Sequence, residues 1–575
     1  MVKVLYGELK WGFIPVKRIV EDYPENSVKA VETDESSEYS NAEKKDLDQQ
    51  TSSATSAAVA EKSGVESANV AEDANVIEYE YRDEADRKWW KFFDEQEYTI
   101  PAHIKNKKKQ WNWFEPNTNG AEKKLLVKLD ILLAFYSCMA YWVKYLDTVN
   151  LNNAFVSGMQ ESLGMTKSDL TTVQNMFSIG NTIFQIPFLF VLFKCPLNYT
   201  LPVLDIVWSL FTVGACKSQT LGQLKACRFF VGAAEAPAYF AYQYLFGSFY
   251  QSTELVRRST FYYFGQYIGV LSSGALQGCL YKYGTATFEG WRVAFLVDAM
   301  ISLGVGFLGF YMLPGNDPYN IYSIFLSDDE IRLLRKRTRR NVFKASDNLL
   351  DWKVWLKLFS QPKIYVLSLF NAFLWCCSNA SSGSYLLWLQ SLKEYSVVKL
   401  NQLSMTSAGI GLVLLAVFGL YADLFNSKYQ AIILSQCVNF TGNIILSCYS
   451  KASKGAKYFA FNIAYSAWAA APTGYMYMAI MSRDAEERSK ILVVANIFAQ
   501  TMSIISNKFA FNAQDAPTYK HGFPFAAAMA VCLSLCSLVV LYMYKRQERT
   551  LAKSNGIVLY NSKTGENYPL DKEEA

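Results

Sequence analysis

Apolar stretches long enough to cross a membrane recur along the chain between Leu125 and Tyr544. A helix needs roughly 20 mostly apolar residues to cross a hydrocarbon core about 30 Å thick. The stretches Ser259 to Tyr281 and Trp291 to Leu313 meet this length with few charges, and neither could be a surface helix of a soluble domain. About a dozen stretches form two equal groups, so the sequence predicts an all-α membrane protein built from two halves.

Polar segments divide the chain around these stretches. The N-terminal segment is rich in Ser, Glu and Ala, a composition that buries too little apolar surface to fold alone. We therefore expect a long, largely disordered cytoplasmic N-terminal tail. The expected regions are this tail over residues 1–124, a six-helix bundle over 125–313, a cytoplasmic linker over 314–362, a second six-helix bundle over 363–544 and a cytoplasmic tail over 545–575.

Two patches inside the N-terminal tail combine aromatic residues with both signs of charge. One begins at Leu9 and reads LKWGFIPVKR, and the other runs from Tyr79 to Tyr98. Each patch could lie against the membrane or against the ends of the helices, and each could equally stay solvated. The pattern leaves both alternatives open.

The positions of Lys and Arg predict the orientation in the membrane, because cytoplasmic loops retain an excess of positive charge. Basic residues gather before the first span, between spans four and five, in the linker and after the last span. We therefore expect both termini and the linker to be cytoplasmic. The formal net charge of +5 is then a topology signal and does not indicate a nucleic-acid partner.

The cysteine and histidine residues limit which metal sites and proton carriers the chain could contain. The 11 cysteines show no paired CxxC spacing, and the two histidines, His103 and His521, lie outside the spans. We expect no metal site and no bound cofactor. Nothing resembles a serine triad or a His-based acyltransferase site, so the sequence argues against an enzyme. A proton carrier inside the membrane would have to be a carboxylate.

Predicted span four carries the most informative ionisable residues. Arg228, Gly232 and Glu235 follow at helical spacings and share one face, with Arg228 expected near the outer end and Glu235 about 10 Å deeper. A carboxyl in a low-dielectric pocket favours its neutral form, which suits a proton carrier. The alternative is that Glu235 is a structural carboxylate and Arg228 a snorkelling end residue.

Other polar residues within the spans are candidates for coupling or for substrate binding. Asp298 in span six joins Arg228 and Glu235 as a proton-coupling candidate, and Asp147 is expected near an end of span one, as a gate or an anchor. Polar residues also hold membrane helices together, so a structural role remains open for each. The substrate-cavity candidates are Lys144, Asp147, Asn150, Trp375, Asn379, Ser384, Asn496 and Gln500.

Four segments resemble the major facilitator superfamily and, within it, the fungal allantoate permease family of anion:cation symporters. The element YLD-x-x-N, from Tyr145 to Asn150, is typical of that family, whereas the Arg-x-x-x-Gly motif is common across the superfamily. The segments are KLDILLAFYSCMAYWVKYLDTVNLNNAFVSGM from Lys128, RFFVGAAEAPAY from Arg228, GWRVAFLVDA from Gly290 and GSYLLWLQSLKEYSVVKLNQLS from Gly383.

The resemblance implies twelve transmembrane helices in two six-helix halves, around a central cavity that opens alternately to each side. It also implies symport of protons with a small organic anion or nutrient, such as a carboxylate, a vitamin or a sulfur-containing amino-acid derivative. The expected setting is a monomer in the plasma membrane, driven by the proton gradient. A nutrient sensor of the same fold that has lost transport is the alternative.

One gate motif of the superfamily is degenerate in this chain. Between spans two and three only Lys194 remains, whereas the second-half counterpart GLYADLFNSK keeps Asp423 and Lys428 as gating candidates. The choice of substrate therefore cannot be copied from a relative.

Overall fold

The computed structural model describes residues 6, 8–10, 13–21, 80–99, 113–114, 118–192, 195–285, 288–338, 356, 359–378, 383–481, 485–563 and 567–568. The chain divides into two units, one formed by Met1–Arg18 with Glu80–Ala575 and the other by Ile19–Tyr79. The fold described below is that of the first unit.

The first half of the bundle consists of six successive spans. Span one contains two π-helical turns, η2 and η3, and it kinks within η3, where Ser157 and Gly158 leave the helical conformation and Gly158 has a positive φ of 107°. Span four is broken between α8 and α9, where Pro237 lacks the N–H that a continuous helix needs. The elements are α3 (Gly120–Leu129), η2 (Asp130–Phe135), α4 (Tyr136–Ala154), η3 (Phe155–Met159), α5 (Gln160–Ser162), α6 (Lys167–Leu192), α7 (Leu197–Cys216), α8 (Leu221–Glu235), α9 (Ala238–Phe249), α10 (Ser252–Leu280) and α11 (Gly290–Met312).

The second half repeats this arrangement with more interruptions. Spans seven and ten are each divided into shorter helices. In span seven the second helix begins directly after Gly383, which has a φ of 68°. Backbone breaks at membrane depth are tolerated where they face protein or a cavity. The elements are α14 (Pro362–Cys376), α15 (Ser384–Ser391), α16 (Val397–Leu424), α17 (Lys428–Ser447), α18 (Lys454–Ile463), α19 (Ser466–Ala469), α20 (Ala471–Met481), α21 (Ala485–Phe509) and α22 (Gly522–Thr550).

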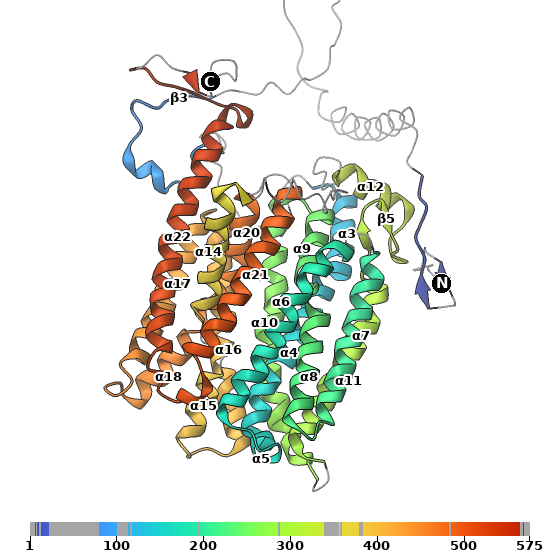
Figure 1. Ribbon diagram of the computed structural model, residues 1–575. Helices are drawn as coiled ribbons and strands as arrows, with labels where there is room; N and C mark the ends of the chain where they lie inside the picture. The colour runs from blue at the N-terminus through green and yellow to red at the C-terminus, as the bar shows by residue number, and fades with distance from the viewer. Residues whose placement is uncertain are drawn as a thin grey trace, which may run out of the picture. The chain divides into compact units, whose positions relative to one another are not determined.

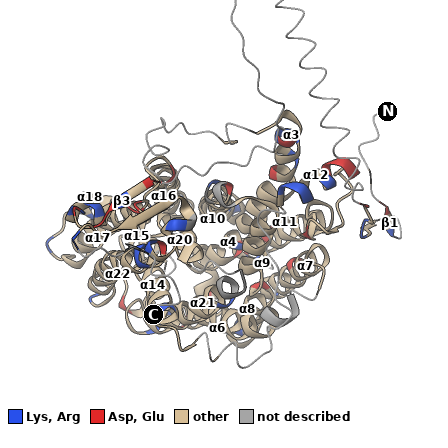
Figure 2. Ribbon diagram, turned by 90° about the horizontal axis from the view of Figure 1, so that it is seen from above, with Lys and Arg blue, Asp and Glu red and all other residues tan. Residues whose placement is uncertain are grey.

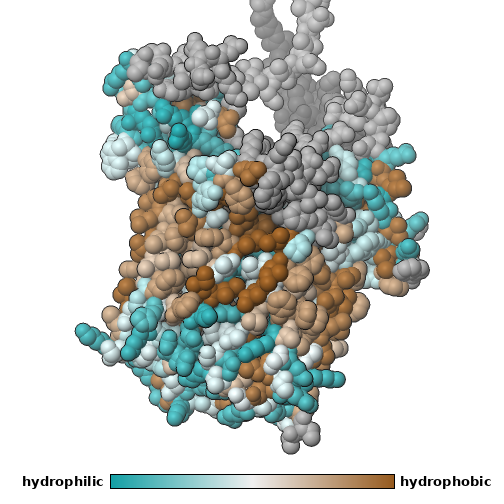
Figure 3. Space-filling view, viewed as in Figure 1, coloured by the Kyte–Doolittle hydropathy of each residue, from teal (hydrophilic) through white to brown (hydrophobic). Residues whose placement is uncertain are grey.

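The described helices thus account for the twelve spans in two halves. By length and composition alone, 6 helices in the described part of the chain could cross a membrane. The other spans are broken or carry polar side chains toward the interior. In the side view an apolar band crosses the visible face of the bundle at mid-height, with hydrophilic residues above and below it (Figure 3). This band is the surface expected to face lipid.

The two halves meet along two helix pairs, α10 with α16 and α6 with α21. Seen from above, α7, α8 and α11 lie on one side of these contacts, and α14, α17 and α22 lie on the other (Figure 2). Gly274 of α10 permits the first contact, because a Cβ there would lie 2.8 Å from the carbonyl oxygen of Asn401 on α16.

Short strands, one α-helix and two 3-10 helices, η1 and η7, occupy the end of the bundle that carries both chain termini, which we call the terminal end (Figure 1). The hairpin β1 (Leu9–Lys10) and β2 (Ile14–Pro15) comes from the first aromatic patch, and β3 (Glu80–Asp83) and η1 (Trp89–Phe93) come from the second. Both patches contact the bundle, an alternative that the sequence had left open. The Tyr199 hydroxyl of α7 donates to the Pro15 carbonyl oxygen in the first patch, and Lys428 of α17 pairs with Glu95 in the second. The remaining elements are β4 (Gly315–Asp317), β5 (Asn320–Ile321), α12 (Asp328–Thr338), η7 (Ala552–Asn555), β6 (Ile557–Tyr560) and β7 (Asn567–Tyr568).

The opposite end of the bundle is closed by an apolar cluster that joins the two halves. Phe155, Trp291 and Phe295 come from the first half and pack with residues such as Trp388 and Phe523 from the second. Two hydrogen bonds cross between the halves at this end, from Asn401 to Ser157 Oγ at 3.1 Å and from the Ala513 backbone N–H to Thr171 Oγ1 at 3.0 Å.

We predict that Gly232→Ala destabilises the protein, because a Cβ at this position would lie 2.1 Å from the backbone oxygen of Phe177 on α6. Overpacking of this kind costs about 1–3 kcal/mol. Gly304→Ala is the matched control, since a Cβ there meets nothing within 4 Å. Thermal unfolding in detergent should show a lower Tm for Gly232→Ala only. Equal melting of both variants would contradict the close approach of α8 to α6.

Candidate functional site

A central cavity lies between the two halves and is lined by both. Its walls come from α4, α6, α8, α9 and α10 of the first half and from α14, α19, α20 and α21 of the second. Four of the predicted cavity residues line it: Lys144, Trp375, Asn496 and Gln500. Arg228, predicted for proton coupling, lines it as well. The polar and aromatic lining residues that the sequence analysis did not select include Tyr141, Tyr145, Asn152, Gln174, Asn181, Gln185, Tyr239, Tyr263, Gln266, Trp468 and Tyr475.

Aromatic side chains connect the halves across this cavity. The rings of Tyr239 and Tyr475 lie 4.9 Å apart, and those of Tyr145 and Trp468 lie 5.7 Å apart. Trp375 Nε1–H donates a hydrogen bond of 2.8 Å to the Tyr475 hydroxyl. Such a lining offers flat apolar faces together with a few placed polar groups, as small-molecule sites do.

Lys144 and Glu235 form an ion pair at the edge of the cavity. The Lys144 ammonium lies 3.3 Å from Glu235 Oε2, and the Glu235 side chain is only 2% exposed. Apart from Lys144, no described residue donates a hydrogen bond to either buried carboxylate oxygen of Glu235. Lys144 is partly exposed and itself lines the cavity. The pair therefore places one group within reach of a solute and keeps the other out of reach.

A second ion pair lies deeper in the first half. Arg228 Nη1 donates to Asp147 Oδ2 at 2.6 Å, and both side chains are almost completely buried. Thr212 Oγ1 also donates to Asp147, at 3.3 Å. Asp298 of α11 is fully buried and accepts one hydrogen bond, of 3.3 Å, from Asn150.

The two ion pairs and Asp298 together contain more acidic than basic side chains. Lys144 and Arg228 supply two positive charges, whereas Asp147, Glu235 and Asp298 supply three negative charges when all are ionised. An unbalanced buried charge is costly in a low-dielectric interior. One proton on a carboxylate would make this group of five residues electrically neutral.

The structure corrects several placements expected from the sequence. Asp147 is not near an end of span one but lies within α4 and is fully buried. Arg228 is not a snorkelling end residue, since its side chain is 2% exposed and paired. Asp147 and Asn150 are not among the cavity-lining residues, and Ser384 lines a smaller neighbouring cavity instead. Asn379 lies outside the described residues.

Ion pairs also link elements at the terminal end. Asp423 of α16 pairs with Arg257 of α10 at 3.0 Å and so joins the two halves. Lys428, the other gating candidate, pairs with Glu95 of the N-terminal tail at 3.2 Å. Arg257 is one of the basic residues between spans four and five that indicate the orientation of the chain. Its role in pairing could not be read from the sequence, because the partner lies 166 residues away.

A comparison of the whole chain with known protein families matches the Major Facilitator Superfamily over residues 135–507. The chain belongs to this superfamily. It is a membrane transporter and not an enzyme, and the all-α major facilitator fold expected from its sequence is confirmed.

Among similar proteins, the vitamin H transporter of Saccharomyces cerevisiae is 36% identical over 508 residues, which cover 86% of this chain and 85% of that protein. The pantothenate transporter liz1 of Schizosaccharomyces pombe is 25% identical over 440 residues, covering 75% of this chain and 84% of that protein. Among solved structures, the proton:xylose symporter XylE has a TM-score of 0.56 at 13% identity, covering 73% of this chain and 96% of that chain. This last likeness is one of fold alone.

We predict that Arg228→Met leaves Asp147 buried without its cation and lowers the free energy of unfolding by about 3–5 kcal/mol. The double variant Arg228→Met/Asp147→Leu should recover most of this loss, because neither buried charge then remains. Thermal unfolding in detergent compares the two. If the double variant is no more stable than the single one, the ion pair does not account for the loss.

Proposed function

We propose that this transporter is a proton-coupled symporter of a small organic anion. The observation that carries the proposal is the group formed by Lys144, Arg228 and three buried carboxylates, Asp147, Glu235 and Asp298, which becomes neutral on taking up one proton. Two relatives support the substrate class, since vitamin H and pantothenate are both small carboxylic acids. Glu235 would carry the proton, with Arg228 and Asp298 setting the charge around it.

The Lys144–Glu235 pair suggests how a proton and an anion would be coupled. While Glu235 is ionised, it holds the Lys144 ammonium at 3.3 Å. Protonation of Glu235 removes this attraction and frees Lys144 to bind a carboxylate that enters the cavity. Loss of the proton restores the ion pair and displaces the carboxylate. Proton and anion thus bind together and leave together.

In this proposal, the net charge of the solute and its proton together would decide which gradient drives accumulation. A monoanion that moves with one proton is neutral overall, so only the pH gradient contributes, at about 1.4 kcal/mol per pH unit. A zwitterionic solute with one proton would carry net charge and also use the membrane potential, at about 2.3 kcal/mol per 100 mV.

Alternating access would require the two ends of the cavity to open in turn. Release of the apolar cluster around Trp388 and Phe523 would open the opposite end, and separation of Arg257 from Asp423 would open the terminal end. The excess of Lys and Arg at the terminal end supports a cytoplasmic position for it and for both termini. We assign the protein to the plasma membrane, as a monomer.

The identity of the anion can be sought by competition for labelled uptake at acid pH. The panel should contain carboxylates, vitamins and sulfur-containing amino-acid derivatives. Sulfoxides belong in it because the segments YEYRDEADRKWW, SIFLSDDEIRLLRKR and NGIVLYNSKTGE resemble those of the yeast sulfoxide-ethionine permease, within the allantoate permease family. Binding of a competitor without any flux would favour a sensor over a transporter.

We predict that Glu235→Gln abolishes accumulation of the solute against its gradient, because the amide cannot exchange a proton. Exchange of labelled for unlabelled solute should persist. Uptake by the wild-type protein should fall as the external pH rises, whereas the variant should show no such dependence. Glu289→Gln, which alters an exposed carboxylate, is the control. Wild-type accumulation and pH dependence in a correctly delivered Glu235→Gln protein would refute the proton role.

We predict that Lys144→Met raises the KM for a transported carboxylate by about 10-fold to 100-fold, since a hydrogen bond to a charged group contributes about 1.5–3 kcal/mol. The primary amide of the same solute should compete almost equally well with both proteins. Lys508→Met removes an exposed Lys from α21 and serves as the control. If the carboxylate and its amide lose affinity equally, Lys144 does not bind the carboxylate.

A further inference from the structure

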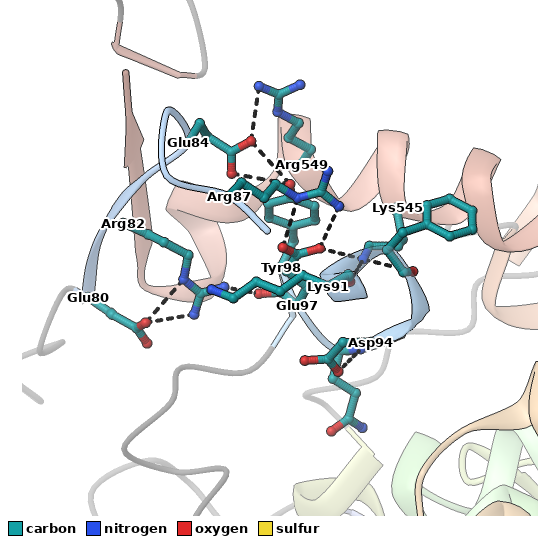
Figure 4. A network of polar contacts seen from close by, with 12 residues as sticks. Glu80, Arg82, Glu84, Arg87, Lys91, Asp94, Glu97, Tyr98, Lys545 and Arg549 are labelled. Atoms are coloured by element: carbon teal, nitrogen blue, oxygen red, sulfur yellow. Dashed lines mark hydrogen bonds and ion pairs between the residues drawn. The ribbon is translucent and has the colours of Figure 1, made fainter. Parts of the chain in front are cut away.

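Residues 80–99 of the N-terminal tail fold against the C-terminal end of the chain. Strand β3 pairs in parallel with β6, which follows the last membrane helix. Glu97 lies at the centre of this contact, where it accepts two hydrogen bonds of 2.9 Å from Arg87 and pairs with Lys545 of α22 (Figure 4). Burial raises the pKa of Glu97, but the hydrogen bonds from Arg87 and Lys545 and their positive charges lower it by more. The pKa therefore lies below its ordinary value, and the carboxylate stays ionised.

Four contacts fix the depth of η1 along the bundle. Glu95 accepts a hydrogen bond of 2.7 Å from the backbone N–H of Lys428, the first residue of α17. The Tyr429 hydroxyl donates to the Phe93 carbonyl oxygen at 2.7 Å. From α22, Lys545 Nζ donates to the carbonyl oxygens of Lys91 and Phe92 at 2.5 and 3.1 Å. The segment is thus held at the level where α17 begins and where α22 approaches its last turns.

The surface of α22 beside this segment carries the lipid-facing pattern. Tyr542, one turn before Lys545, is 56% exposed, and Val539 and Leu535 continue the same apolar stripe along the helix. Figure 1 shows the segment beside the upper end of α22, at the edge of the bundle. The outer face of η1 therefore lies where the apolar band gives way to the polar region.

The side chains around η1 differ in exposure according to their chemistry. Trp89, Trp90 and Phe93 are 74%, 53% and 44% exposed, and Lys88 and Lys91 are exposed beside them. The Lys88 ammonium lies 5.0 Å from the Trp90 ring. Glu95 and Glu97, in contrast, are buried against cations of the bundle. Lys88, Lys91 and the three aromatic side chains thus face outward, whereas Glu95 and Glu97 face the protein. Asp86 of the same segment is also exposed, and Arg87 turns inward to Glu97.

We propose that the aromatic face formed by Trp89, Trp90 and Phe93 inserts into the headgroup region of the bilayer beside α17 and α22. Trp is enriched at this depth because its ring is apolar and its N–H can still bond to water or lipid. Lys88 and Lys91 would lie near the lipid phosphates. The tail is then anchored twice, to the protein through Glu95 and Glu97 and to the lipid through the aromatic face.

The test uses the full chain in nanodiscs made with lipids brominated near the headgroup end of their acyl chains. The fluorescence of Trp89 and Trp90 is obtained as the difference between the wild type and Trp89→Ser/Trp90→Ser. We expect this difference signal to be quenched by the brominated lipids several-fold more than the signal obtained in the same way with Trp375→Phe. Trp375 lines the central cavity and is the internal control.

Two results would overturn the proposal. Quenching of the Trp89 and Trp90 signal by acrylamide in water, with no effect of brominated lipid, would show a solvated face. Resistance to both quenchers would show that protein covers it.

A second variant separates anchoring from folding of the segment. Lys88→Glu/Lys91→Glu leaves the contacts of Glu95 and Glu97 intact, since the two Lys side chains are exposed. We expect weaker quenching by brominated lipid in this variant, most clearly in nanodiscs containing anionic lipid, with unchanged hydrogen exchange in β6. Unchanged quenching in anionic nanodiscs would contradict the placement of these Lys residues near phosphates.

Discussion

Five ionisable side chains on α4, α8 and α11, four of them buried and Lys144 at the cavity, set the main constraint on this structure, because a charge in the membrane interior must be compensated where it lies. Arg228 and Lys144 each have a carboxylate partner, and Asp298 adds a further acidic group. Gly232 lets α8 approach α6 closely. The packing of the first half is thus inseparable from its charge balance, and the proposed proton coupling rests on the same imbalance.

The second half contributes a different chemistry to the cavity. Trp375, Trp468 and Tyr475 present rings and hydroxyl or indole groups, while Asn496 bridges to Gln185 of the first half at 3.3 Å. These residues come from broken or polar spans, whose exposed backbone and side chains are satisfied by the interior and not by lipid. The first half therefore supplies the charged groups at the cavity, and the second half supplies aromatic and uncharged polar groups to its lining.

At the terminal end, ion pairs join the two halves to each other and join the N-terminal tail to helices of the second half. Arg257 and Asp423 join the halves directly, whereas Glu95 binds the start of α17 and Glu97 the end of α22. The N-terminal tail is consequently part of the folded structure at residues 80–99. Glu95 and Glu97 are used in contacts with the protein, which leaves Lys88, Lys91 and the aromatic face on the outside.

The sequence alone determined the membrane class, the two-half architecture and the identity of the buried charges, because span length and the cost of burying charge are properties of short segments. It also identified Lys144, Trp375, Asn496 and Gln500, which do line the cavity. Only the tertiary structure decided the partners. Lys144 and Asp147 lie one turn apart on α4, yet one borders the cavity and the other pairs with Arg228, 81 residues away. Such pairing depends on how each helix is rotated against its neighbours, and no local pattern encodes that rotation.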